Sequence, residues 1–295
     1  MTPSLSALLD LLQPESLEVN LFRGAVRDPG WGRLYGGLVL AQALAAAEST
    51  VPAERSVHSM HAYFLRPGDV SVPVVYQVDP IRDGRSFTTR RVVAIQHGKA
   101  ILNLSASFQV AETGLSHQEA MPEVPPPEDL EPQWVLAKRI AERLPDTVRT
   151  QSTQIQPIEH RPVDPTDPTR PSRRPPSRCV WYRAVDPLPD DPRLHRRLLA
   201  WSSDAHFLTT AMQPHGVSWM TPGIQMASLD HAMWFHRDFR MDQWLLYVID
   251  SANANGSRGH VRGRFFTRDG ILVASTTQEG LMRDWRHTES PQERP

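Results

Sequence analysis

One carboxylate in this sequence stands where an apolar side chain is expected. Apolar residues recur three and four positions apart over about 193–212, a spacing typical of an amphipathic helix. Asp204 lies inside that pattern, and its neighbours at i−4, i−3, i+3 and i+4 are all apolar: Ala200, Trp201, Phe207 and Leu208. A carboxylate on a buried face is costly to desolvate, and such groups cluster at catalytic sites. Asp204 is therefore either a general base or a structural carboxylate held by a backbone amide or an arginine.

A second polar side chain, Gln278, is predicted to face inward from a strand. The two-residue alternation of a strand over 271–281 gives it a shared face with small and apolar residues: Leu272, Ala274, Thr276 and Gly280. A single buried glutamine is more often a hydrogen-bonding partner than a catalytic group. Gln278 alone would therefore not indicate a reaction.

The chain around these residues combines a buried helix with a run of strands. Residues 38–48 are nearly all apolar and helix-forming, so we expect a buried helix that starts near Gly36 and Gly37. Strands are predicted at 57–65, 72–79, 87–97 and 100–110, and turn residues such as His97-Gly98 separate them. One helix followed by antiparallel strands predicts the α+β class, with the sheet wrapped around the helix.

The second half of the chain repeats this order. Strands are predicted at 178–184, 225–235, 244–250, 260–267 and 271–281, with the Asp204 helix after the first of them. Short matches about 170 residues apart indicate a duplication: His61–Phe64 with His231–Trp234, Tyr76–Asp79 with Tyr247–Asp250, and Arg90 with Arg262. In the first copy Gln42 lies in the helix that would match the Asp204 helix, and Ala106 stands in place of Gln278. Because the acid and the inward glutamine occur in one copy only, the pattern favours a catalytic role over a structural one.

Proline marks the region between the two halves. More than half of the 27 prolines lie between Pro122 and Pro192. We predict an N-terminal unit over 1–111, a Pro-rich connector over 112–177, a C-terminal unit over 178–286 and a tail over 287–295. The connector is expected to be irregular over 157–178, and its arginines form either a phosphate-binding patch or, more commonly, part of a solvated linker.

Composition excludes several classes of protein. Hydrophobic residues make up 40% and charged residues 22% of 295 residues, which suffices for two globular units. The net charge of −1, without a basic block, argues against a nucleic-acid partner. A single cysteine, Cys179, favours a reducing compartment. No apolar run reaches the ~18 residues of a membrane span and no leader-like pattern opens the chain, so we expect a cytoplasmic protein.

Several runs resemble the type II (TesB-type) acyl-CoA thioesterases. They are Phe22-Arg23-Gly24, Tyr35-Gly36-Gly37 and Tyr63–Asp69 in the first half, and Ser203-Asp204, Leu229–His236 and Val273–Gly280 in the second. The resemblance extends from about residue 3 to residue 284 and weakens over 150–178. It implies a double hotdog, in which each of two tandem units is an antiparallel sheet wrapped around a central helix.

The resemblance also implies an activity and a site. The family hydrolyses acyl-CoA thioesters to free fatty acid and CoA without a cofactor, and its catalytic residues map onto Asp204, Ser228 and Gln278. Ser228 stands where bacterial members have Thr, and it keeps the hydroxyl. Asp204 would activate a water that Ser228 and Gln278 orient, the amides at Gly36-Gly37 would polarise the carbonyl oxygen, and His58 is a candidate neighbour of the substrate.

Other chemistries fit the sequence less well. A serine hydrolase lacks its Gly-x-Ser-x-Gly motif here, and in one continuous strand His231 would face away from Ser228. His58-x-x-His61 would place its rings on opposite faces of a strand, so no metal site is predicted. Two alternatives remain open: a hotdog enoyl-CoA hydratase that uses Asp204 with His206, and an acyl-CoA binding protein without turnover. Whatever the reaction, a homo-oligomer, dimer or tetramer, is expected.

Overall fold

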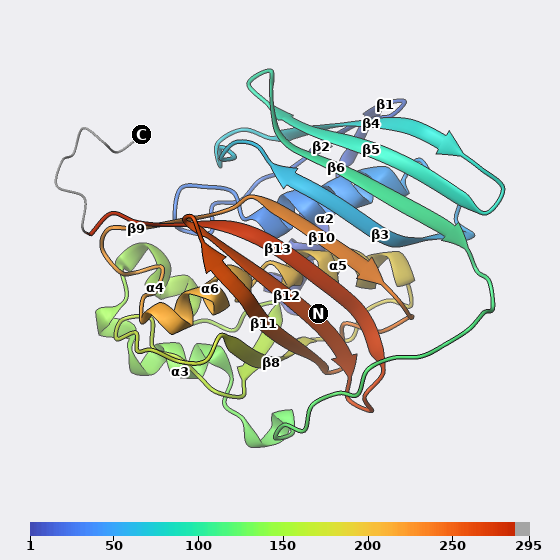
Figure 1. Cartoon of the computed structure of the whole chain (residues 1–295). Helices are drawn as coiled ribbons and strands as arrows, with labels where there is room; N and C mark the ends of the chain where they lie inside the picture. Colours follow the sequence, from blue (N-terminus) through green and yellow to red (C-terminus); the bar gives the residue numbers. More distant parts are fainter. Residues whose placement is uncertain (287–295) are drawn as a thin grey trace.

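The computed structural model describes residues 1–286, and within them two units of the same design lie side by side (Figure 1). Each unit is an antiparallel sheet against a helix, as the α+β prediction requires. The predicted tail, residues 287–295, lies outside the described residues. No helix within the described range is long and apolar enough to cross a membrane.

The first unit surrounds a single buried helix. Its strands, in spatial order, are β1 (Glu15–Glu18), β2 (Leu21–Gly24), β4 (Val74–Asp83), β5 (Phe87–Gln96), β6 (Lys99–Val110) and β3 (Arg55–Phe64). Helix α2 (Gly36–Glu48) is buried from Gly37 to Glu48, because the sheet covers part of it and α5 of the second unit covers another part. Helix α1 (Pro3–Leu11) packs its leucines against the same core. The hairpin between β5 and β6 turns at His97 and Gly98, both with positive φ, as predicted.

The second unit continues the sheet from β3 outward, and its strands mirror those of the first unit. Its strands run β10 (Asp230–Phe235), β13 (Leu272–Asp284), β12 (Arg258–Thr267), β11 (Leu245–Asn255), β8 (Ser177–Ala184) and β7 (Ile158–Pro162). Helices α5 (Pro192–Ser203) and α6 (Phe207–Met212) take the place of α2, and a short strand, β9 (Ile224–Ser228), pairs with the end of β13. Two more helices, α3 (Gln133–Arg139) and α4 (Asp146–Ser152), lie in the Pro-rich segment.

The two units join in one continuous sheet through β3 and β10. These strands pair antiparallel, with Met60 opposite Met233 and Tyr63 opposite Asp230. The helices of the two units also meet, because α2 packs against α5. The junction therefore brings the start of α2, the end of α5 and the start of β10 into one region of the molecule.

The predicted irregular connector over 157–178 is wrong for one stretch. Residues Ile158–Pro162 form β7, the outermost strand of the second sheet, which pairs with β8. A proline is tolerated there because an edge strand needs no inter-strand hydrogen bond on its outer side. The surrounding prolines conceal this five-residue strand in the sequence.

The duplication is real, but two of the matched pairs do not correspond in space. Tyr76 and Tyr247 are both fully buried, as equivalent residues should be. Arg90 is buried, whereas Arg262 has 57% of its side chain exposed. His61 is likewise exposed and His231 buried. A one-residue slip in alignment exchanges the two faces of a strand, so sequence identity misaligned these pairs by one position.

Candidate active site

Asp204 lies at a break between two helices and not within one. Helix α5 ends at Ser203, Asp204 is its C-cap, and His206 has a φ of 64° before α6 begins. The predicted continuous helix over about 193–212 is therefore wrong. The hydroxyl of Ser202 donates to the carbonyl of Leu198, and such side-chain bonds compete with regular helix hydrogen bonding near the end. Apolar spacing continues across the break, so the sequence pattern does not reveal it.

The break aims the carboxylate of Asp204 at the first turn of α2 in the other unit. The amide of Gly37 donates a hydrogen bond to Oδ2 at 3.1 Å. The amides of a first helical turn have no partner inside the helix, so this end of α2 favours negative charge. The structure thus brings both predicted glycines to Asp204. The Gly37 amide is engaged by the carboxylate, whereas the Gly36 amide precedes it in the same turn.

Glycine is required at both positions because the helices approach so closely. A Cβ added to Gly36 would lie 2.8 Å from Oδ2 of Asp204, and one added to Gly37 would lie 2.2 Å from the carbonyl oxygen of Trp201. The hydroxyl of Tyr35 donates to the same carbonyl at 2.9 Å, which ties the start of α2 to the end of α5. This contact between units fixes the position of the carboxylate.

Ser228 and Gln278 meet beside Asp204. Nε2 of Gln278 donates to Oγ of Ser228 at 2.9 Å, and both side chains also hydrogen-bond to the carboxylate of Asp204. Gln278 is 1% exposed on the inner face of β13, as the alternation predicted. Asp204 and Ser228 are only partly buried. The three predicted catalytic residues therefore form one cluster, in which two members are accessible to water.

His231, which no pattern in the sequence assigns to the site, completes this cluster. The side chain is fully buried, and its Nδ1 lies 2.7 Å from Oε1 of Gln278. Its Nε2 lies 3.0 Å from Oγ of Ser203. The expectation that it faces away from Ser228 assumed one continuous strand over 225–235. The chain instead breaks at Leu229 between β9 and β10, so the alternation restarts and both side chains reach Gln278.

The protonation states of the cluster follow from burial. Burial raises the pKa of Asp204 above its ordinary value, although His231, the Gly37 amide, Gln278 and Ser228 each lower it in part. Burial also lowers the pKa of His231, so the ring is neutral at neutral pH. Because Oε1 of Gln278 can only accept, the hydrogen of the neutral ring is on Nδ1. The hydroxyl of Ser203 has one hydrogen, for which Nε2 of the ring at 3.0 Å and the carbonyl of Ala200 at 2.9 Å are alternative acceptors.

Two other predicted histidines lie apart from the cluster. His58 contacts Ser107, with 2.8 Å between Nε2 and Oγ, and its ring packs edge-on against Phe87. A bulge in β3 next to His58 interrupts the regular alternation there. His206 accepts at Nδ1 from Arg178 at 3.1 Å, and its buried Nε2 has no hydrogen-bond partner among residues 1–286, so the Asp204–His206 pair of the hydratase alternative is not formed.

The helix of the first unit holds a structural amide in place of the acid. Gln42 is fully buried, and its Nε2 donates to the carbonyls of Leu11 and Ala25 at 2.6 and 2.8 Å. Its Oε1 accepts from the hydroxyl of Tyr76 at 2.7 Å. With these bonds made, Gln42 ties the N-terminal segment to the core and leaves no polar group free for a substrate. The asymmetry inferred from the sequence is therefore present in space.

Comparison with known proteins places the whole chain in one group. Residues 27–109 match a family model described as acyl-CoA thioesterase N-terminal domain, and residues 151–281 match one described as acyl-CoA thioesterase. The chain is 40% identical to acyl-CoA thioesterase 2 of Haemophilus influenzae, over 96% of this chain and 99% of that one. It is 41% identical to acyl-coenzyme A thioesterase 8 of Homo sapiens, over 92% and 88% of the two chains.

A solved structure shows the same architecture. The acyl-CoA thioesterase II TesB2 from Mycobacterium marinum aligns with a TM-score of 0.76 and 42% sequence identity, over 93% of this chain and 97% of that one. A hot dog fold protein from Alicyclobacillus acidocaldarius aligns with a TM-score of 0.74 at 22% identity, over 94% and 98% of the two chains, and bears on the fold alone. The predicted α+β double hotdog is confirmed.

Proposed function

The chain belongs to the acyl-CoA thioesterase family, and from that premise we propose that Asp204, Ser228 and Gln278 carry the hydrolysis of the thioester. The enzyme class is established by the relatives, as the sequence motifs predicted. The roles of the individual residues rest on the geometry of the cluster. The observation that supports them best is the hydrogen bond from Gln278 to Ser228 beside a carboxylate whose pKa is raised.

In the proposed mechanism, Asp204 removes a proton from a water as the water oxygen attacks the thioester carbonyl carbon. Ser228 and Gln278 orient that water, since both are within hydrogen-bonding reach of Asp204. A raised pKa brings the carboxylate closer to the basicity that proton removal at neutral pH requires. Orientation and proton transfer together supply several kcal/mol of barrier lowering.

The carbonyl oxygen gains negative charge in this step and needs a hydrogen-bond donor. We assign that role to the Gly36 amide at the start of α2, where helix geometry leaves N–H groups without internal partners. The tetrahedral intermediate then collapses and the carbon–sulfur bond breaks. The proton held by Asp204 passes to the leaving sulfur, which gives free acid and CoA.

His231 has a positioning role in this scheme. Its Nδ1–H donates to Oε1 of Gln278, which turns the amide so that Nε2 faces Ser228. The hydroxyl hydrogen of Ser228 is then directed to Asp204. If the amide oxygen and nitrogen of Gln278 exchanged places, the hydroxyl of Ser228 would donate to the amide oxygen. Its hydrogen bond to the carboxylate of Asp204 would then be lost. His231 therefore sets the direction of the hydrogen bonds around the water.

The test is release of CoA from a chain-length series of saturated acyl-CoA substrates, followed with a thiol reagent. Asp204→Ala should lower kcat by at least about 100-fold, the usual contribution of a general base. Asp79→Ala removes an exposed carboxylate of the first unit that pairs with Arg91, and it should leave kcat unchanged. Undiminished turnover in Asp204→Ala would show that the site assignment is wrong.

A hydratase or a binding protein gives different results in the same assay. Without CoA release by the wild-type chain, only binding or hydration of enoyl-CoA would remain. The expected dimer or tetramer is a separate proposal, and sedimentation equilibrium of the full chain measures it.

A further inference from the structure

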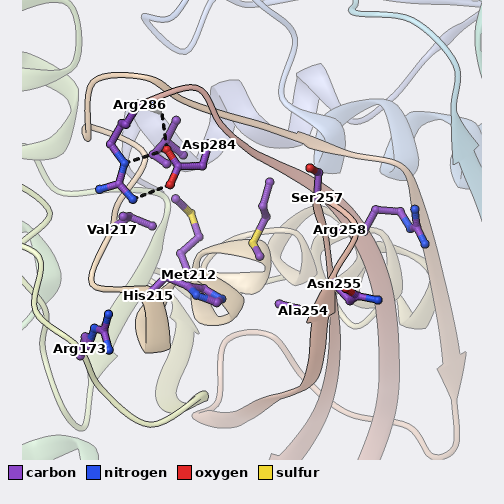
Figure 2. Close-up of a pocket in the computed structure, with 12 residues that line it drawn as sticks. Arg173, Met212, His215, Val217, Ala254, Asn255, Ser257, Arg258, Asp284 and Arg286 are labelled. Atoms are coloured by element: carbon purple, nitrogen blue, oxygen red, sulfur yellow. Dashed lines mark hydrogen bonds and ion pairs between the residues drawn. The ribbon is translucent and has the colours of Figure 1, made fainter. Parts of the chain in front are cut away.

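A hollow opens in the second unit at the Ile224 end of β9, whereas Ser228 lies at the other end of this strand (Figure 2). Its volume is about 400 Å³, inside the range of small-molecule pockets. The apolar part of its lining comes from Met212 at the end of α6, Ile224 at the start of β9 and Met282 on β13. Two thioether side chains in one wall offer a polarisable contact surface for a flat ring.

Three arginines surround the hollow, and Figure 2 shows them on different sides of it. Arg258 pairs with Glu279 at 2.9 Å, and Arg286 pairs with Asp284 at 2.6 Å, so two of the charges are compensated. No carboxylate among residues 1–286 pairs with Arg173. Its positive charge therefore gives the hollow an attraction for an anion.

The fold holds Arg173 in this place. The residue belongs to the Arg/Pro-rich segment, whose arginines had two readings from the sequence, a phosphate patch or a solvated linker. Its Cγ would lie 3.2 Å from a Cβ added to Gly216, a glycine with a φ of 62° that follows His215 on the rim. The close approach to this turn positions Arg173 at the hollow.

The hollow lies a definite distance from the catalytic cluster. Ser228 and Ile224 are four residues apart on β9, which corresponds to about 13 Å at ~3.3 Å per residue. On β13, the side chains of Gln278 and Met282 lie on the same face, because they are an even number of residues apart. Helix α6 runs between the two places, from just after Asp204 to Met212.

Coenzyme A has matching dimensions and chemistry. Thirteen bonds separate its sulfur from its first phosphorus, and an extended chain of that length spans about 15 Å. Its far end carries a pyrophosphate, a 3′-phosphate and an adenine ring. Arginine is the side chain best suited to phosphate, and methionine sulfur packs well against aromatic rings.

We propose that this hollow binds the 3′-phosphoadenosine diphosphate end of coenzyme A while the thioester lies at Asp204, Ser228 and Gln278. Arg173 and Arg258 contact the phosphates, and Met212 and Met282 contact the adenine. The inference rests on the proposed function, because the distance is measured from the proposed catalytic cluster.

The test compares two thioesters of the same acid, acyl-CoA and acyl-pantetheine, of which the second lacks all phosphates. Arg173→Ala and Arg258→Ala should each raise the KM for acyl-CoA about tenfold, as expected for loss of one charge-assisted hydrogen bond. The KM for acyl-pantetheine should stay within about twofold of the wild-type value. Arg91→Ala, an exposed arginine of the first unit, is the matched control and should change neither.

If acyl-pantetheine is turned over too slowly for its KM to be measured, binding of a nucleotide fragment of CoA tests the same hollow. Adenosine 3′,5′-diphosphate should bind the wild-type enzyme in calorimetry and bind Arg173→Ala about tenfold more weakly. Equal losses on both thioesters, or no change in either the KM or the nucleotide affinity, would overturn the subsite. Failure of the catalytic assignment looks different, since Asp204→Asn would then keep turnover on both substrates while the arginine variants still discriminated between them.

Discussion

The role of His231 can be tested with two substitutions that each keep one of its contacts. The amide nitrogen of an asparagine lies close to where Nδ1 of the ring lay, so His231→Asn keeps a donor for Oε1 of Gln278. The longer glutamine reaches the position of Nε2, so His231→Gln keeps the contact with Ser203 and withdraws the donor from Gln278. Both variants replace a buried ring with an amide, so each costs packing in a similar way.

The structure gives the expected magnitudes. Gln278 is 1% exposed, so in His231→Gln its Oε1 becomes a buried acceptor without a partner, at about 1–3 kcal/mol. If that cost falls on the oriented transition state, kcat decreases by ~5- to ~150-fold with little change in KM. In His231→Asn the donor remains, and kcat should stay within about threefold of wild type.

The assay is steady-state release of CoA, with thermal melts of both variants as the control for folding. A double-mutant cycle with Gln278→Ala adds a second criterion. If His231 acts through Gln278, His231→Gln should have little further effect once the amide is removed. Equal losses of kcat in the two single variants, or full additivity in the cycle, would refute the positioning role and leave His231 as a residue of the fold.

The same geometry gives four further expected outcomes. Burial raises the pKa of Asp204, so stability falls as pH rises from the ordinary aspartate pKa to the raised value, and the full cost of ionisation remains at higher pH. Asp204→Asn should therefore melt above wild type at neutral pH while losing at least about 100-fold in kcat. For wild type, kcat/KM should rise with pH, and the midpoint of that rise should lie above the ordinary pKa of aspartate. A midpoint at or below that pKa would contradict the raised pKa of Asp204. Ser228→Thr should keep kcat within about threefold because the hydroxyl remains, whereas Ser228→Ala should lower it about tenfold or more, and equal activity of the two would exclude an orienting hydroxyl. Gly36→Ala should lower kcat about tenfold or more with the protein still folded, because the new Cβ would lie 2.8 Å from Oδ2 of Asp204 and 3.1 Å from the ring of Phe64; an unaffected kcat would show that the carboxylate need not stay where it is.

Much of the fold was predictable because local patterns carry it. The alternation along β13 placed Gln278 inward, and the His97-Gly98 turn fixed the hairpin between β5 and β6. The duplication predicted two equivalent units, since each repeated the order of helix and strands. The short strand β7 escaped prediction, because its pairing with β8 depends on a neighbour in space and not on its own Pro-rich sequence.

The site was predictable only in part. By itself the sequence determined that Asp204 is an acid among apolar residues and that Gln278 faces inward, because both statements depend on the period of a single element. Only the tertiary structure decided that α5 stops at Asp204, that Gly37 of the other unit donates to it, and that His231 reaches Gln278 across the break at Leu229. These contacts join residues 47 to 167 positions apart, and their geometry follows from how two units pack. Periodicity within one segment carries no information about such distances.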